Sequence, residues 1–139
     1  MSSAEEWFAT NHLKLNEEKT QKMTFTSNKN THKMEPIKSL GIILDANLNW
    51  GPHIDATTAK ISSQIFALRQ MRQSLDKTVL KMVYYALVHS HLSYGILLWG
   101  NSCKANKLFF LQKAAIRLIA DVEYREPCHD LFKRYEILP

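Results

Sequence analysis

The spacing of apolar residues changes once along the chain, close to residue 51. Before that point, apolar and polar side chains alternate in two stretches, residues 19 to 25 and 37 to 44. The alternating apolar positions are Met23, Phe25, Leu40, Ile42 and Leu44. Because alternation is typical of half-buried strands, we expect these stretches to form a small antiparallel sheet, closed by a turn at residues 45 to 50.

Three local signals surround these two stretches. Ser3 followed by Glu6 has the spacing of a capping box, so residues 3 to 13 are expected to form a short helix that packs Trp7, Phe8 and Leu13. Residues 26 to 33 have the composition of a polar loop. Gly41, inside the second apolar stretch, indicates a bulge or a close approach of the backbone to another segment.

From His53 onward the apolar spacing becomes helical. Ile61, Ile65, Leu68 and Leu75 share one face of a helix of about 20 residues. Arg72 falls inside that apolar stripe, so its tip needs a carboxylate, a carbonyl or water.

Three more helices are expected after this one. Asp76 is placed to cap the first of them, which runs towards Gly95 and Gly100, where the backbone is disturbed. Its expected apolar face consists of Leu80, Val83, Tyr84, Leu87 and His91. The next helix spans residues 104 to 120 and buries Leu108, Leu111, Ala115 and Ile119. A short helix within residues 127 to 138 closes a three- to four-helix bundle, so the fold class is α+β.

The charge balance separates the two halves of the chain. Residues 1 to 51 carry six basic and six acidic side chains, whereas residues 52 to 139 carry twelve basic and seven acidic ones, so the whole net charge of +5 lies in the helical part. A polyanionic partner would therefore meet the helices. Lys113 and Arg117, four residues apart on one helix with Phe110 beside them, and Arg69 are the candidate nucleic-acid contacts. The alternative is an ordinary solvated helix face.

The sequence contains no motif of a complete catalytic centre. Asp45, Asp55 and Asp76 are single carboxylates at expected turns or helix starts, and a capping role explains them better than metal binding. His89 and His91 point about 200° apart on a helix, and no CxxC pair is present, so a zinc site is not expected. Two distant cysteines and no signal-like start indicate free thiols in a reducing compartment.

Five stretches in succession carry a family resemblance. They read WFATNHLKLNEEKTQKMTF, IKSLGIILDANLNWGPHI, SHLSYGILLWG, LQKAAIRLI and CHDLFKRYEIL. In this order and spacing they resemble the C-terminal part of the reverse transcriptases of non-LTR (LINE-type) retrotransposons, in particular the jockey-like ones. The resemblance covers nearly the whole chain.

The resemblance implies a role for each half of the chain. Residues 1 to 51 would be a palm edge, in which Lys19 approaches the phosphates of the incoming nucleotide and Leu40 and Gly41 belong to a primer-gripping hairpin. The family more often has an aromatic residue where Ser39 stands. Residues 52 to 139 would be the thumb, which lies against the template–primer duplex.

The resemblance also implies what the chain lacks. The intact polymerase requires Mg²⁺, held by aspartates that include the pair of a YxDD motif, and no such motif occurs in this sequence. We therefore expect a fragment that is not catalytic alone, binds an RNA–DNA duplex weakly, and lacks the palm and fingers segments of its parent. A stand-alone module that binds nucleic acid or protein, or a non-functional remnant, is the alternative. An intact element's enzyme would act on nuclear DNA, but no basic import run is visible, and no membrane contact is expected.

Overall fold

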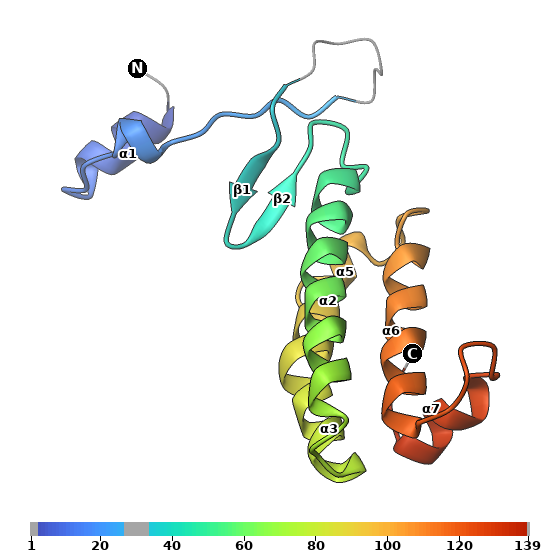
Figure 1. Cartoon of the computed structure of the whole chain (residues 1–139). Helices are drawn as coiled ribbons and strands as arrows, with labels where there is room; N and C mark the ends of the chain where they lie inside the picture. The colour runs from blue at the N-terminus through green and yellow to red at the C-terminus, as the bar shows by residue number, and fades with distance from the viewer. Residues whose placement is uncertain (1–2, 27–33, 139) are drawn as a thin grey trace.

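The computed structural model describes residues 3 to 26 and 34 to 138. An N-terminal helix, α1 (Ser3–Thr10), and a 3₁₀ turn, η1 (Glu17–Lys19), precede a two-stranded antiparallel sheet, and helices follow (Figure 1). The α+β class predicted from the sequence is confirmed. The polar loop predicted for residues 26 to 33 lies, apart from Thr26, outside the described residues.

The helices pack around two long members that lie side by side, α2 (Gly51–Met71) and α6 (Asn106–Ala120). The chain returns along α2 through α3 (Lys77–Tyr84), the π-helix η2 (Tyr85–His89) and α4 (Ser90–Ser93). The short α5 (Ile96–Trp99) leads into α6, and α7 (His129–Tyr135) packs against α6 (Figure 1). Fully buried side chains in the centre include Ile54, Ile61, Leu68, Tyr84, Val88, Ala115 and Ile116.

The π-helix shifts the buried face predicted for the returning segment. Four residues advance an α-helix by about 400°, so residues spaced four apart drift around its surface. In η2 the Ser90 N–H donates to the Tyr85 carbonyl, five residues earlier, and this wider turn removes the drift. The residues buried along the segment are Leu80, Tyr84, Val88 and Leu92. The predicted Val83, Leu87 and His91 are only half-buried.

The sheet is a hairpin formed by the second predicted stretch alone. β1 (Ile37–Ser39) pairs with β2 (Ile42–Leu44), with Ile37 opposite Leu44 and Ser39 opposite Ile42. The predicted strand at residues 19 to 25 is wrong: η1 ends at Lys19, and residues 20 to 26 are irregular. Thr26 donates its N–H to the Ala46 carbonyl, 3.0 Å away, which attaches this segment to the turn after β2. β1 and β2 pair with each other, and the outward-facing Ile43 N–H donates to His53 on α2 instead of to a third strand.

Helix α1 lies apart from the bundle (Figure 1). None of its residues is buried, Trp7 is 58% exposed, and only Phe8 is half-buried. The prediction that this helix packs Trp7 and Leu13 is therefore wrong, since both side chains are more than half exposed; the Trp7 ring contacts the neighbouring Phe8 ring. The helix itself is confirmed, with Ser3 as its first residue.

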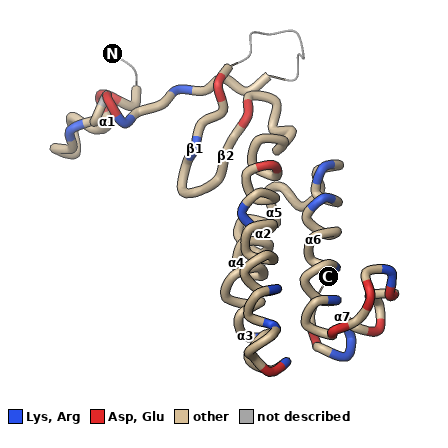
Figure 2. Tube along the Cα trace, viewed as in Figure 1, with Lys and Arg blue, Asp and Glu red and all other residues tan. Residues whose placement is uncertain are grey.

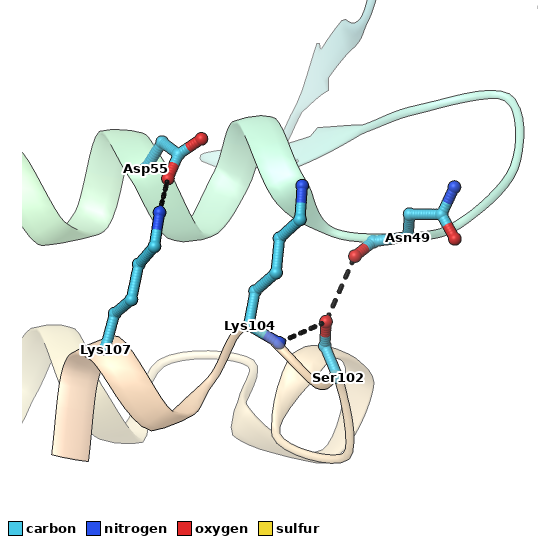
Figure 3. A network of polar contacts seen from close by, with 5 residues as sticks. All are labelled: Asn49, Asp55, Ser102, Lys104 and Lys107. Atoms are coloured by element: carbon cyan, nitrogen blue, oxygen red, sulfur yellow. Dashed lines mark hydrogen bonds and ion pairs between the residues drawn. The ribbon is translucent and has the colours of Figure 1, made fainter.

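Polar contacts fix both ends of the α2–α6 pair. At the start of the helices, Lys107 Nζ lies 2.8 Å from Asp55 Oδ1, and the Ser102 hydroxyl donates to the Asn49 carbonyl at 3.1 Å (Figure 3). At their other end, Arg72 pairs with Asp121 at 2.8 Å, which supplies the carboxylate expected for this arginine. Asp76 caps α3 as predicted, since its carboxylate accepts the Val79 N–H at 2.8 Å.

Within the described residues, no helix combines the length and the apolar character that crossing a membrane requires.

Candidate nucleic-acid interface

The tip of the hairpin is formed by Leu40 and Gly41. Both have positive φ angles, 48° and 84°, the backbone combination of the tight turns that join two-residue hairpins. Leu40 is 89% exposed, so an apolar side chain projects from the tip. Its carbonyl oxygen accepts a hydrogen bond from the Tyr94 hydroxyl. The tip is therefore exposed on its outer side and attached to the helical part on its inner side.

The segment that receives the hairpin is the turn between α4 and α5. Gly95 adopts a positive φ of 65°, and a Cβ atom on it would lie 2.7 Å from the Ile42 Cδ1 atom. The Trp99 indole N–H donates to the Tyr94 carbonyl at 3.0 Å and closes this turn. The turn at Tyr94 and Gly95 therefore contacts the hairpin at Leu40 and at Ile42 of β2. The backbone disturbance at Gly95 was predictable from the sequence, whereas the contact made by Tyr94 was not.

His53 joins the hairpin to α2. The Ile43 N–H donates to His53 Nδ1 at 3.4 Å, and the imidazole lies 6.0 Å from the Trp99 ring, measured between centroids. Burial, together with the charge of Lys60, lowers the pKa of His53 below its ordinary value of 6.5. The neutral imidazole can accept at Nδ1, so this pKa direction agrees with the hydrogen bond. The buried Nε2 atom has no hydrogen-bond partner among the residues described.

Lys19, matched to a nucleotide-phosphate contact, lies at the end of η1. Its side chain is exposed, and its backbone N–H is held by the Asn16 carbonyl at 3.2 Å and by the Asn16 side chain at 3.1 Å. This segment lies with α1, apart from the helices (Figure 1). The structure therefore does not bring Lys19 next to the hairpin tip.

Lys113 and Arg117 lie on the side of α6 that faces α7. Neither is fully exposed, contrary to the expectation of an open polar face. Lys113 Nζ sits 4.1 Å from the centroid of the Phe109 ring and 5.7 Å from that of Phe110. Arg117 donates through Nε to the Glu126 carbonyl at 2.8 Å, and its guanidinium lies 5.6 Å from the Tyr124 ring centroid. Each of the two cations therefore lies beside at least one aromatic ring.

Arg69 lies on a different helix from Lys113 and Arg117. It is exposed in the last turn of α2. Lys107 marks the side of α6 that faces α2, because it pairs with Asp55. Lys113 is six residues further on, about 240° around the helix, so it points away from that side. Figure 2 shows acidic residues interspersed with basic ones around α7.

No group of three or more histidine, cysteine, aspartate or glutamate side chains gathers in the described part of the chain with the arrangement of a metal site. Cys103 is free and exposed, and Cys128 is free and buried.

Comparison with known proteins gives one informative match. The chain is similar to the probable RNA-directed DNA polymerase from transposon BS of Drosophila melanogaster, with 35% identity over 92 residues, which cover 63% of this chain and 10% of that protein. The chain therefore spans about a tenth of the length of this relative. No protein-family model and no solved structure matches it. The match supports the resemblance to retrotransposon reverse transcriptases: over 63% of its length the chain is similar to a transposon RNA-directed DNA polymerase.

Proposed function

We propose that the chain is a non-catalytic part of an RNA-directed DNA polymerase, in which the hairpin contacts the primer end and the helices contact the template–primer duplex. Residues 1 to 51 serve as the palm edge and residues 52 to 139 as the thumb. The metal ions and the carboxylates that hold them belong to other segments of the polymerase. In the assembled enzyme, Lys19 would approach the phosphates of the incoming nucleotide.

One observation carries the proposal: the hairpin tip is both exposed and anchored. Leu40 projects into solvent, while the Tyr94 hydroxyl, the Gly95 turn and His53 hold the hairpin against the helices. An element that positions a primer terminus needs an accessible contact surface and a fixed orientation relative to the duplex. Exposure of Leu40 supports the first requirement, and the anchoring contacts support the second.

The basic helices support the duplex contact through charge. The net charge of residues 52 to 139 is twelve minus seven, or +5. Contacts to a nucleic-acid backbone are electrostatic and independent of sequence. Arg69, Lys113 and Arg117 are proposed to make them. Because few phosphates can be neutralised, we expect an affinity on the order of micromolar or weaker for the chain alone.

The test compares a recessed primer end with a blunt end. Fluorescence anisotropy of the full chain with two RNA–DNA duplexes of equal length, one blunt and one with a recessed 3′ end, measures the preference for a primer terminus. Leu40→Asn removes the apolar tip and retains a residue that tolerates positive φ. We expect it to weaken binding of the recessed duplex by about three- to tenfold, since one apolar contact is lost.

Leu48→Asn is the matched control. Leu48 is also a partly exposed leucine with a positive φ, 51°, but it lies in the turn after β2 and not at the tip. We expect this variant to bind both duplexes as the unmodified chain does. Equal binding of the two duplexes by the unmodified chain, or equal losses in the two variants, would refute the primer-end contact.

A further inference from the structure

A cleft of about 490 Å³ opens between α6 and α7. Its lining residues are Phe109, Lys113, Arg117, Pro127, Cys128, His129, Phe132 and Lys133. The volume lies within the range of about 300 to 1,000 Å³ that small-ligand sites occupy. The cleft is therefore large enough for one nucleotide and too small for a duplex.

The charged side chains that line the cleft have one sign. Lys113, Arg117 and Lys133 contribute cations, and none of the acidic side chains in the described ranges lines it. Glu126 takes part through its backbone carbonyl, which accepts from Arg117 Nε. Asp130 lies in the first turn of α7, outside the lining set. The cleft is thus electrostatically suited to an anion.

The rest of the lining is apolar and aromatic. The rings of Phe109 and Phe132 stack at 6.0 Å between centroids with an angle of 21° between their planes. Two further rings, Phe110 and Tyr124, are 67% and 81% exposed and lie beside Lys113 and Arg117, respectively, outside the lining of the cleft. Aromatic faces beside phosphate-binding cations are the combination that binds single-stranded nucleic acids, because every base has a face that can stack.

We infer that this cleft binds an unpaired nucleotide of a single-stranded nucleic acid. The base contacts the apolar wall formed by Phe109, Phe132 and Pro127, and the flanking phosphates lie on Lys113, Arg117 and Lys133. The inference rests on the proposed contact between the helices and nucleic acid, and it adds a second class of ligand, since bases in a duplex are stacked and cannot enter. The exposed Tyr124 ring extends the stacking surface to a neighbouring base.

The first test uses two adjacent residues. Lys133 and Arg134 are both exposed on α7, but only Lys133 lines the cleft. Anisotropy with a labelled oligothymidine of about 10 nucleotides, within the site sizes usual for single strands, measures the affinity. We expect Lys133→Gln to weaken binding by about three- to tenfold, because one phosphate contact is lost, and Arg134→Gln to change it by less than about twofold.

The salt dependence adds a second measurement. Each phosphate contact on a single strand contributes a slope of about 0.7 in log affinity against log salt concentration. The double variant Lys113→Gln/Lys133→Gln should therefore lower the slope by about 1.4. Circular dichroism of each variant shows whether the fold is retained. Equal effects of Lys133→Gln and Arg134→Gln would mean that net charge alone attracts the strand, and this would overturn the inference.

Competition identifies what the cleft recognises. Thymidine monophosphate should displace the oligothymidine at a concentration at least about tenfold lower than inorganic phosphate does, because only the nucleotide brings a base to stack. Equal potency of the two competitors would mean that the cleft recognises phosphate alone. Displacement by polyglutamate at a similar concentration of charge would mean that the cleft binds an acidic peptide. Either result would overturn the inference.

These outcomes are independent of the primer-end test. Lys133 takes no part in the proposed duplex contacts, so Lys133→Gln should leave the preference for a recessed end unchanged. If the chain binds oligothymidine through Lys133 but does not distinguish recessed from blunt duplexes, the nucleotide site in the cleft is supported and the primer-end contact is refuted. Equal weakening of single-strand and blunt-duplex binding by Lys133→Gln would show that the cleft does not select an unpaired nucleotide, and this would overturn the inference.

Discussion

At the scale of single residues, three positions hold the hairpin against the helical part. Tyr94, Gly95 and His53 hold it through a hydroxyl, a missing side chain and an imidazole nitrogen, respectively. Each of these contacts uses a different property of the residue. Substitutions at the three positions should therefore differ in their consequences, and Gly95 gives the clearest case.

Gly95→Ala is expected to destabilise the protein by about 1 to 3 kcal/mol, because a non-glycine residue is strained at positive φ. The added Cβ would also approach the Ile42 Cδ1 atom to 2.7 Å, so the Ile42 side chain of the hairpin must shift. Urea unfolding followed by circular dichroism measures the difference in the free energy of unfolding.

Gly51→Ala is the control for this change. A Cβ on Gly51 would meet the Lys104 Nζ atom at 2.5 Å, but that is the far end of a flexible side chain, which can move away. We expect a change in unfolding free energy of less than about 0.5 kcal/mol, typical of a substitution without a buried clash. Equal destabilisation by the two alanines would show that the Gly95 turn is not a special constraint.

At the scale of elements, the attachment of the hairpin to α2 should respond to pH. The pKa of His53 is lower in the folded protein than the ordinary value of 6.5, so the unfolded chain binds more protons near and below pH 6.5. The stabilising contribution is complete above pH 6.5 and is lost as the pH falls through the folded pKa. Protonation also removes the lone pair on Nδ1 that accepts the Ile43 N–H.

The measurement is the free energy of unfolding in urea between pH 5 and pH 8. The unmodified chain should lose stability towards pH 5 more steeply than His53→Asn does. His12→Asn serves as the comparison, because His12 is an exposed histidine next to α1. A His53→Asn variant that retains the full pH dependence, while His12→Asn loses it, would contradict the assignment to His53.

The elements differed in how far the sequence could predict them. Local signals were sufficient for α2 and for the Asp76 cap, because periodicity and capping act within a few residues, whereas the Asp121 partner of Arg72 could not be named. The π-helix was not foreseen, because the apolar residues of this segment also fit an ordinary α-helical stripe, which hid the four-residue spacing of Leu80, Tyr84, Val88 and Leu92. The strand predicted at residues 19 to 25 failed because alternation alone does not supply a partner.

The residues of the candidate interface could be predicted from the sequence only in part. The family resemblance implied a hairpin at Leu40 and Gly41, and these residues do form the turn between β1 and β2, whereas their contact with a primer stays a prediction. Tyr94 and His53 were missed because they act across 54 and 10 residues of sequence, respectively. Lys113 and Arg117 were predicted on the correct helix, but on an open polar face instead of the side that faces α7. The packing of α7 on α6 cannot be derived from the periodicity of either helix.

At the scale of the whole molecule, protection of the backbone should decrease from the helices to the hairpin. Residues 37 to 44 form two three-residue strands without a fully buried side chain, whereas residues 78 to 90 include the buried Leu80, Tyr84 and Val88. Local opening is easiest where few apolar contacts are lost. We therefore expect amide hydrogen exchange to be faster across residues 37 to 44.

Mass-spectrometric hydrogen exchange of the unmodified chain at one pH and temperature tests this order. Gly95→Ala is an informative second sample, since it should accelerate exchange in the hairpin more than in α6. Slower exchange across residues 37 to 44 than across residues 78 to 90 would show that the hairpin is the better protected element. In that case the anchoring contacts would be stronger than their number suggests.

The two cysteines give the molecule a built-in reporter of its own opening. Cys103 is exposed between α5 and α6, whereas Cys128 is 6% exposed, with its sulfur 3.8 Å from the Lys113 carbonyl oxygen. A maleimide reagent should therefore modify Cys103 first and Cys128 more slowly, because Cys128 is buried in the wall of the cleft between α6 and α7. The fraction of chains that carry two labels, read from the intact mass, then reports how readily the cleft admits the reagent, and no probe has to be introduced.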